Sequence, residues 1–320
     1  MSDTPERPVT KMRGAPRIIR LFDIDVYVHW SWLVVGVLLI QSRSDEYANV
    51  LWNIFEYASL FMIVLLHEFG HALACRSVGG VAERIMLWPL GGVAYVRPPQ
   101  RPGATLWAIA AGPLVNVALL PVTIGFAFAV RTAAPHSNLE HYAVSIAFIN
   151  AIVLVFNILP IYPLDGGQIL RAVLWFFIGP HKSLTIATAI GLFGAGGCLL
   201  LAFNFGDFWL MALAGFGALS SWSGLRVARA RAAAAQLPRH GHVVCPECRE
   251  PPPVGRCWPC SQCRAPFDAF EQTGTCPRCG HVEETAGCPF CGGRIPVPAG
   301  TAGFTAIAIS SEIADAPDTL

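Results

Sequence analysis

Charged residues are scarce in this 320-residue chain: Asp, Glu, Lys and Arg make up 13% of it, about half the ~25% of an ordinary soluble domain. This scarcity excludes a disordered or polyelectrolyte protein. The formal net charge of +1 leaves no general excess of basic residues for binding nucleic acid along the whole chain. Hydrophobic residues make up 54% and the mean hydropathy is +0.50, which indicates that a lipid bilayer surrounds much of the chain.

Long runs without a charged residue recur along the chain, each with about the ~17 to 25 residues that a helix needs to cross a bilayer. They are residues 26–42, 104–130, 142–164, 183–206 and 208–225. A sixth run, residues 51–78, is equally apolar except for Glu56 and a polar group at 67–76. The six runs predict an all-α polytopic membrane protein with about six transmembrane helices. No small-residue cleavage pattern follows the first run, so we expect it to remain as an anchor.

Basic residues fall almost entirely in alternate loops between these runs. They precede the first run, separate the second from the third and the fourth from the fifth, and follow the sixth: Arg7, Lys11, Arg13, Arg17, Arg20, Arg76, Arg84, Arg97, Arg101, Arg171, Lys182, Arg226, Arg229, Arg231 and Arg239. Cytosolic loops carry the excess of Lys and Arg in membrane proteins. We therefore expect a multi-pass protein of the cell membrane with both termini in the cytosol.

The run 51–78 contains the sequence His-Glu-Phe-Gly-His at 67–71, an HExxH motif. Its two histidines are one helical turn apart, so both imidazoles can hold one Zn²⁺, and Glu68 can act as the base for a water that the metal activates. The five-residue pattern is degenerate when it stands alone. Within hydrocarbon, however, an ionised carboxylate costs roughly 2.5 to 3.5 kcal/mol, so a glutamate flanked by two histidines there favours a functional site.

The far end of the run 142–164 supplies a candidate third ligand. It reads Asn-Ile-Leu-Pro-Ile-Tyr-Pro-Leu-Asp-Gly-Gly at 157–167, and its prolines and glycines break the helix next to Asp165. A solvated aspartate in a helix-ending turn is the plainer interpretation. The topology favours a ligand, because it places His67, His71 and Asp165 toward the cytosolic side together and a His-His-Asp site leaves one position for water.

These two motifs, with Ala-Gly-Pro-Leu-Val-Asn at 111–116, resemble the site-2 protease family of intramembrane zinc metalloproteases. The resemblance covers about residues 20–225. It implies zinc held by His67, His71 and Asp165 with Glu68 as the general base. It further implies substrate or active-site contacts for Asn116 and Asn157, for which interhelical hydrogen bonding is the alternative. Because only residues 76–103 separate the second and third runs, the chain resembles the simpler branch of the family, which lacks an inserted peptide-binding domain.

The resemblance implies hydrolysis of peptide bonds within or next to transmembrane segments of membrane-protein substrates. A substrate helix must unwind locally before its carbonyls can be attacked. Residues 87–96 read as a small hairpin whose free edge can pair with an extended substrate, or else as an interfacial turn. A second hypothesis is a catalytically inactive membrane scaffold that presents the cysteine-rich segment to a cytosolic partner. A transporter is disfavoured because the motifs do not recur as inverted repeats.

Nine of the eleven cysteines lie between residues 245 and 291. A Cys-x-x-Cys pair, eight residues and a second pair occur twice, which predicts two structural four-thiolate zinc sites of the ribbon kind. The expected ligands are Cys245, Cys248, Cys257 and Cys260 for one site, and Cys276, Cys279, Cys288 and Cys291 for the other. Cys263 is then spare, although a register that uses Cys263 in place of Cys257 fits equally. Disulfides are the alternative chemistry, which a reducing cytosol disfavours.

The charged residues around these cysteines are balanced in sign, so a cytosolic protein partner is expected for the ribbons and nucleic acid is not favoured. The predicted organisation has five parts: a cytosolic segment at 1–24, the intramembrane metalloprotease domain at 25–225, a basic linker at 226–240, the double zinc ribbon at 241–294 and a disordered tail at 295–320.

Overall fold

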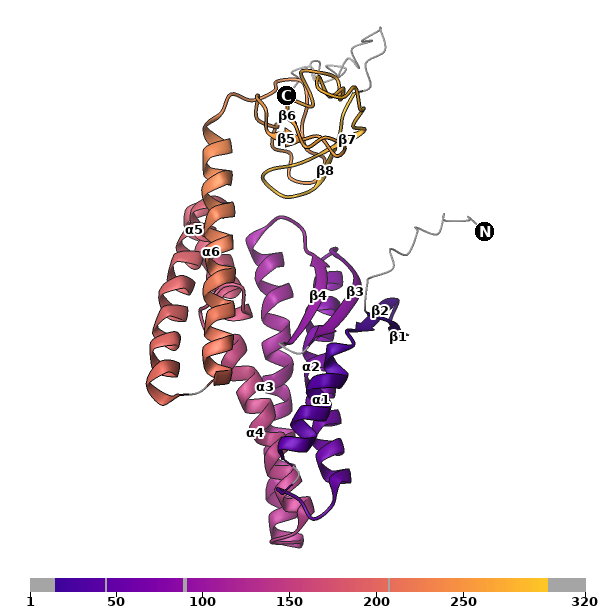
Figure 1. Ribbon diagram of the computed structural model, residues 1–320, viewed down its shortest axis with the longest axis vertical. Helices are drawn as coiled ribbons and strands as arrows, with labels where there is room; N and C mark the ends of the chain where they lie inside the picture. The colour runs from indigo at the N-terminus through magenta and orange to yellow at the C-terminus, as the bar shows by residue number, and fades with distance from the viewer. Residues whose placement is uncertain (1–14, 44, 89–90, 207, 299–320) are drawn as a thin grey trace, which may run out of the picture. The chain divides into compact units, whose positions relative to one another are not determined.

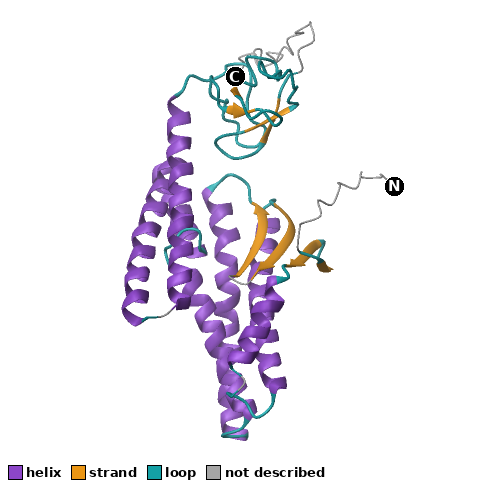
Figure 2. Ribbon diagram, viewed as in Figure 1, coloured by secondary structure: helices purple, strands orange, loops and turns teal. Residues whose placement is uncertain are grey.

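A computed structural model describes residues 15–43, 45–88, 91–206 and 208–298 of the chain. The chain divides into two compact units, Met1–Ala233 and Ala234–Leu320. The first unit is mainly helical and the second consists mostly of loops with short strands (Figures 1 and 2). The predicted tail falls largely outside the described residues, as does most of the N-terminal segment.

Helices form most of the first unit, in agreement with the predicted helical membrane fold. They are α1 (Ser31–Ser42), α2 (Val50–Ser77), α3 (Pro102–Ala133), α4 (Asn138–Ile158), α5 (Asp165–Phe205) and α6 (Phe208–Gln236), which extends into the second unit. Among the described residues, four helical segments are long and apolar enough to cross a membrane: α2, α3, α4 and the Lys182–Phe205 part of α5. Many of their large apolar side chains are exposed in the isolated chain, as lipid-facing residues are.

The predicted count of six spans is not confirmed. The expected first span divides between a strand, Ile24–Val28, and the 12-residue helix α1; twelve helical residues rise only about 18 Å, less than the ~30 Å hydrocarbon core. Residues 208–225 lie in α6, which is not among the candidate spans found in the described residues. The backbone of α5 breaks at Gly179, where φ is 77°, directly before Pro180.

The first unit also contains a four-stranded sheet, which the sequence did not predict as a whole. Two of its strands precede α2 in the chain and two follow it. Its strands are β1 (Arg17–Leu21), β2 (Ile24–Val28), β3 (Val81–Trp88) and β4 (Gly91–Arg97), in the order β1-β2-β3-β4, and only β2 and β3 are parallel. Alternate residues of β3 are buried, as expected for a strand with one face on a core. The buried face packs on α2 through a cluster that includes Ile85, Leu87 and Phe69. The hairpin predicted around residues 87–96 is thus present, and β4 is an edge strand.

The connection between α4 and α5 places the first residue of α5 beside α2. Helix α4 ends at Ile158 and α5 begins at Asp165. In the loop that connects these two helices, the carbonyl oxygen of Tyr162 accepts a hydrogen bond from Ser221 on α6. The close approach of this loop is possible because Gly191 on α5 has no side chain: a Cβ there would lie 2.6 Å from the Tyr162 nitrogen.

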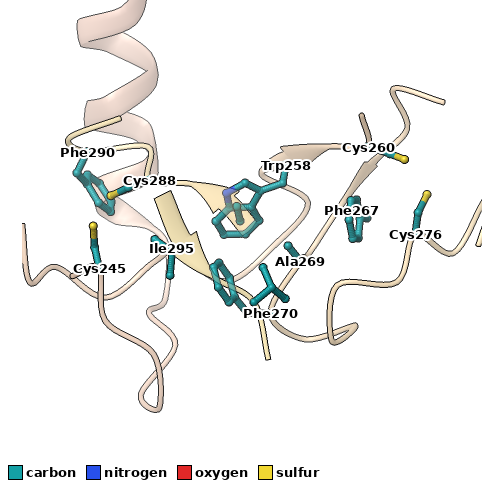
Figure 3. Packing of buried hydrophobic residues seen from close by; sticks show 12 residues of the cluster. Cys245, Trp258, Cys260, Phe267, Ala269, Phe270, Cys276, Cys288, Phe290 and Ile295 are labelled. Carbon is teal, nitrogen blue, oxygen red and sulfur yellow. The ribbon is translucent and has the colours of Figure 1, made fainter. Parts of the chain in front are cut away.

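The second unit has an apolar centre between two groups of cysteines. Figure 3 shows Trp258, Phe270 and Ile295 in the middle, with Cys245 and Cys288 toward one end and Cys260 and Cys276 toward the other. Short strands join the parts of the unit: β5 (Trp258–Pro259) pairs with β6 (Pro266–Phe267), and β7 (Thr285–Gly287) pairs with β8 (Arg294–Pro296).

Two of the predicted domain boundaries differ from the described structure. Ile295 is fully buried and lies in β8, so the ribbon unit extends past the predicted start of the tail at 295. The predicted linker 226–240 is helical as far as Gln236. The boundary between the two compact units, after Ala233, falls inside that predicted linker.

Candidate active site and metal sites

Three potential metal ligands from two helices meet in the first unit. His67 and His71 lie one turn apart on α2, and Asp165 is the first residue of α5. Asp165 Oδ2 lies 2.9 Å from His67 Nε2 and 3.2 Å from His71 Nε2, and the two Nε2 atoms are 3.1 Å apart. All three side chains are buried. The sequence predicted this convergence across 98 residues.

The outer nitrogens of both imidazoles are occupied, which leaves the inner ones to face a common centre. His71 Nδ1 lies 2.9 Å from the carbonyl oxygen of Ala108, and His67 Nδ1 lies 2.5 Å from Asn116 Oδ1. Both partners are acceptors, so each Nδ1 carries a hydrogen and each Nε2 is directed inward. Two Nε2 atoms and a carboxylate oxygen then converge, an arrangement that a divalent cation stabilises.

The spacing of these atoms fits zinc. Ligands about 2.0 to 2.1 Å from a tetrahedral ion lie roughly 3.3 Å from one another, close to the separations of 2.9, 3.1 and 3.2 Å found here. Two imidazoles and one carboxylate also form a typical catalytic ligand set, which leaves a fourth position open.

Helix α3 approaches the two histidines through Gly112, within the motif at 111–116. A Cβ atom at Gly112 would lie 2.3 Å from His71 Nε2 and 2.8 Å from His67 Nε2. Any side chain at this position would therefore occupy the space next to the inner nitrogens. One turn further along α3, Asn116 holds His67, so the same face of α3 both makes room for the rings and orients one of them.

Glu68 lies beside the three ligands and is not one of them. It is 5% exposed, and strand β4 lies against its carboxylate at Gly92. Strand β4 can lie this close because residue 92 is a glycine: a Cβ there would lie 2.5 Å from Glu68 Oε1. The edge strand of the sheet thus covers the carboxylate expected to act as the base.

Asn116 lies within the active site, in contact with one of the metal-ligand candidates. It is fully buried; its Oδ1 contacts His67, and its Nδ2 donates to Asn150 Oδ1 at 2.8 Å. Asn150, in turn, donates to the Asn116 carbonyl oxygen. Because both ends of the Asn116 amide are engaged, this residue positions His67; a substrate role for it stays a prediction. Sequence reasoning missed Asn150, although an amide in the middle of an apolar run is itself a signal.

Asn157, the other residue expected to contact substrate, lies near the end of α4. Its side-chain amide donates to the Val153 carbonyl oxygen of the same helix, and the residue is half-buried. A substrate role for Asn157 stays a prediction.

Eight cysteines form two further groups in the second unit. One group contains Cys245, Cys248, Cys288 and Cys291, and the other contains Cys260, Cys263, Cys276 and Cys279. Within each group, sulfur atoms from the two different pairs are 3.6 to 3.7 Å apart. This is near the ~3.8 Å expected between sulfurs around a tetrahedral ion with Zn–S bonds of about 2.3 Å. These distances are too long for disulfide bonds.

The predicted assignment of the cysteines is wrong in two respects. The sites are nested along the chain. The first Cys-x-x-Cys pair, Cys245 and Cys248, shares a site with the last pair, and the two pairs between them form the other site. Cys263 replaces Cys257, which is exposed and belongs to neither group. The alternative register with Cys263 is therefore the one that the geometry supports.

Backbone conformation explains why Cys257 is excluded. In each of the four pairs, the residue directly after the second cysteine has a positive φ and donates its N–H to the carbonyl oxygen of the first cysteine; these residues are Arg249, Arg264, Gly280 and Gly292. Such a turn directs both sulfurs to one point. The sequence Trp258-Pro259 is instead extended in β5, so Cys257 and Cys260 cannot form this turn.

Comparison with known proteins agrees with this arrangement. Residues 55–133 and 120–201 match the model of Peptidase family M50. The chain is 31% identical over 182 residues to a zinc metalloprotease of Methanocaldococcus jannaschii, covering 56% of this chain and 51% of that protein. It is 36% identical over 151 residues to stage IV sporulation protein FB of Bacillus subtilis, covering 46% of each. The chain spans about half the length of the curated relatives it matches.

A solved site-2 protease from Methanocaldococcus jannaschii aligns with a TM-score of 0.48 and 25% identity, over 66% of this chain and 95% of that one. The family match itself spans α2 to α5 and includes every element that contributes to the His-His-Asp group. Residues 55–201 of this chain are therefore similar to peptidase family M50 across all the elements that form this group.

Proposed function

We propose that the chain is a zinc-dependent intramembrane metalloendopeptidase, which hydrolyses peptide bonds within or next to the transmembrane segments of membrane-protein substrates. The observation that carries the proposal is the buried group His67, His71 and Asp165 with Glu68 beside it on α2. Several relatives are named zinc metalloproteases, which supports the same chemistry.

The proposed metal content is one catalytic zinc ion and two structural ones. His67, His71 and Asp165 would hold the catalytic ion, which supplies Lewis acidity: it lowers the pKa of water and stabilises negative charge on the oxygen of the scissile carbonyl. The carbonyl of Ala108 and the amide of Asn116 hold a hydrogen on each Nδ1, so that Nε2 of each imidazole is the nitrogen that would bind the ion.

Glu68 is the proposed general base. It directly follows His67 in α2, so its side chain projects about 100° around the helix from that ligand, to the side of the site. There it takes a proton from the attacking water and delivers it to the leaving nitrogen of the peptide. The close contact with Gly92 of β4 holds the carboxylate in place, so little reorganisation is needed for the proton transfer.

The free edge of β4 is the proposed docking position for the unwound part of a substrate. In a transmembrane helix the carbonyl groups are engaged in internal hydrogen bonds. A segment that unwinds can replace those bonds by pairing with β4, whose Gly92 lies against Glu68. The pairing would bring a peptide carbonyl next to the base and the metal ligands together.

The proposed location is the cell membrane, with both termini in the cytosol. The distribution of Lys and Arg among the loops supports this orientation. The ribbon unit would then lie in the cytosol, where reduced cysteines bind zinc, and a protein partner is its proposed ligand.

Glu68→Gln tests the catalytic proposal, and Glu56→Gln is its matched control. Glu56 is a second buried glutamate of α2, three turns away, and it pairs with Arg43 at 2.8 Å. Each variant is co-expressed with a single-span membrane protein, and both cleavage and bound zinc are measured. We expect Glu68→Gln to lose cleavage and keep zinc, and Glu56→Gln to keep both. Equal cleavage by the wild type and Glu68→Gln would rule out Glu68 as the base; no cleavage by any form, with zinc bound, would favour the inactive scaffold.

A further inference from the structure

The loop that joins α4 to α5 is closed by hydrogen bonds that tie it to the start of α5. The N–H of Leu164 donates to the carbonyl oxygen of Ile161 at 2.8 Å. The side-chain amide of Gln168, on the first turn of α5, donates to the carbonyl oxygen of Pro163 at 2.9 Å. Because Asp165 directly follows this closed turn, a displacement of the loop also displaces Asp165.

The two halves of α5 both lie against Tyr162, in the middle of this loop. A Cβ atom at Gly167 or at Gly191 would lie 2.6 Å from the Tyr162 nitrogen. On one straight helix these two glycines would be about 36 Å apart. The break at Gly179 therefore turns the second half of α5 back beside the first, and the Tyr162 backbone contacts both halves.

Helix α6 holds the same residue through Ser221, which is fully buried. The Ser221 hydroxyl donates a hydrogen bond to the Tyr162 carbonyl oxygen. It also lies next to α5, because a Cβ atom at Gly191 would stand 2.9 Å from Ser221 Oγ. At a second position on α6, a Cβ atom at Gly224 would lie 2.9 Å from Tyr162 Cε1. Helix α6 thus contacts both the backbone and the ring of Tyr162.

We propose that Ser221 is a positioning residue for Asp165, so that α6 helps to set the geometry of a metal site to which it supplies none of the three ligand candidates. The two histidines are held relative to each other by α2. The Asp165 carboxylate instead reaches their Nε2 atoms, at 2.9 and 3.2 Å, from the end of the loop that Ser221 holds. Partners outside the ligand shell tune metal affinity by fixing where a ligand lies. The inference rests on the proposed metallopeptidase function.

Two pairs of variants test this role in the purified full chain in detergent micelles. Ser221→Ala removes the hydroxyl; Ser223→Ala is its matched control, because Ser223 is an exposed serine of α6 that bonds within its own helix. Gly191→Ala pushes directly on the Tyr162 nitrogen. Its matched control is Gly196→Ala, which adds the same methyl group to α5 at a position with nothing within 4 Å.

Competition with a chelator measures zinc affinity, and cleavage of a single-span membrane protein gives kcat and KM. Asp165→Ala, measured alongside, identifies the share of the bound zinc that belongs to the His-His-Asp group and not to the ribbon cysteines. An unchanged zinc content in Asp165→Ala would refute the proposed catalytic metal site, and this inference with it.

We expect Ser221→Ala to lower the affinity for the catalytic zinc about three- to tenfold, as for the loss of one hydrogen bond, and Gly191→Ala to lower it at least as much. Both variants should retain the ribbon zinc and should lower kcat with little change in KM. Ser223→Ala and Gly196→Ala should match the wild type.

Wild-type affinity in both Ser221→Ala and Gly191→Ala would overturn the positioning role and leave the proposed peptidase function intact. An equal loss of affinity in the control variants would overturn it as well. Should Ser221→Ala fail to fold, the comparison of Gly191→Ala with Gly196→Ala decides the outcome in the same way.

Discussion

Gly92 on β4 lies so close to Glu68 on α2 that a Cβ atom at position 92 would stand 2.4 Å from Glu68 Cγ. The strand and the proposed base are therefore in contact through a position where a side chain cannot fit without displacing one of them. The position of β4 therefore limits where that carboxylate can lie.

Gly92→Ala should lower the rate of peptide cleavage with little effect on zinc. The added methyl group pushes Glu68 or β4 away by a distance on the order of 1 Å, and such a misplacement can reduce kcat about 100-fold. The metal ligands lie on α2 and α5 and are not displaced directly. Cleavage kinetics and zinc content check this expectation, with Val93→Ala, an exposed position of β4, as the control. Loss of zinc in Gly92→Ala would contradict it.

Asn116→Ala should weaken catalytic zinc binding, because His67 loses the acceptor that orients its ring. Removal of such an outer partner typically reduces metal affinity by about 10- to 100-fold. Asn150→Ala should have a smaller effect in the same direction, since it frees the Asn116 amide. Competition with a chelator measures both affinities. Asn157→Ala, which changes a residue bonded within its own helix, should retain wild-type affinity; equal losses in all three variants would argue against a specific role for Asn116.

The two cysteine groups predict different results for neighbouring substitutions. Cys263→Ala removes one thiolate from a four-sulfur group and should release one structural zinc and destabilise the ribbon unit. Cys257→Ala should leave the zinc content unchanged, because Cys257 is exposed and outside both groups. Elemental analysis of the purified variants gives the number of ions per chain. The reverse pattern would restore the assignment predicted from the spacing of the cysteines.

Asp268 should make the stability of the ribbon unit depend on pH. Burial raises the pKa of its carboxyl, but the N–H groups of Gly255, Glu271 and Phe270, together with His240, outweigh burial and lower that pKa below its ordinary value. Its stabilising contribution is then present above the unfolded pKa of about 3.9 and is lost as the pH falls through the lower folded value.

Asp268→Asn should therefore destabilise the unit at pH 7 by at least about 1 kcal/mol, because an amide cannot accept all of these hydrogen bonds. Thermal unfolding at pH 7 and at successively lower pH checks this expectation. The difference between the variant and the wild type should shrink below pH ~4 as the wild-type carboxylate becomes protonated. A difference that grows toward acidic pH would contradict the assignment.

Relationships within one or two helical turns were predictable from the sequence. The spacing of His67 and His71 places them on one face of any helix, and the prolines near Asp165 require a break there. Membrane topology extended this reasoning to the pairing of Asp165 with the histidines, because it restricts which loop ends can meet. The same argument could not count the spans, since a run of apolar residues also suits a buried strand such as β2.

Relationships that depend on close approach in three dimensions were not predictable. Nothing in the sequence around Asn150 says that it meets Asn116, and Gly92 reads as an ordinary turn glycine until β4 is seen against Glu68. The cysteines are an intermediate case. The residue after the second cysteine of each binding pair has a positive φ, and Ser261, which follows Cys260, is not among these residues. The spacing of the cysteines, which is the same for Cys257 and Cys260 as for the binding pairs, does not reveal this local difference.

The nested order of the cysteines also dictates a sequence of assembly during synthesis. The inner group is complete once Cys279 has left the ribosome, and it closes over a shorter stretch of chain than the outer group, at a smaller entropic cost. The outer group cannot close until Cys291 has emerged. A chain that stops before Cys288 would therefore contain one complete metal site and only two of the four cysteines of the outer site. The outer site can form only after the whole unit has been translated.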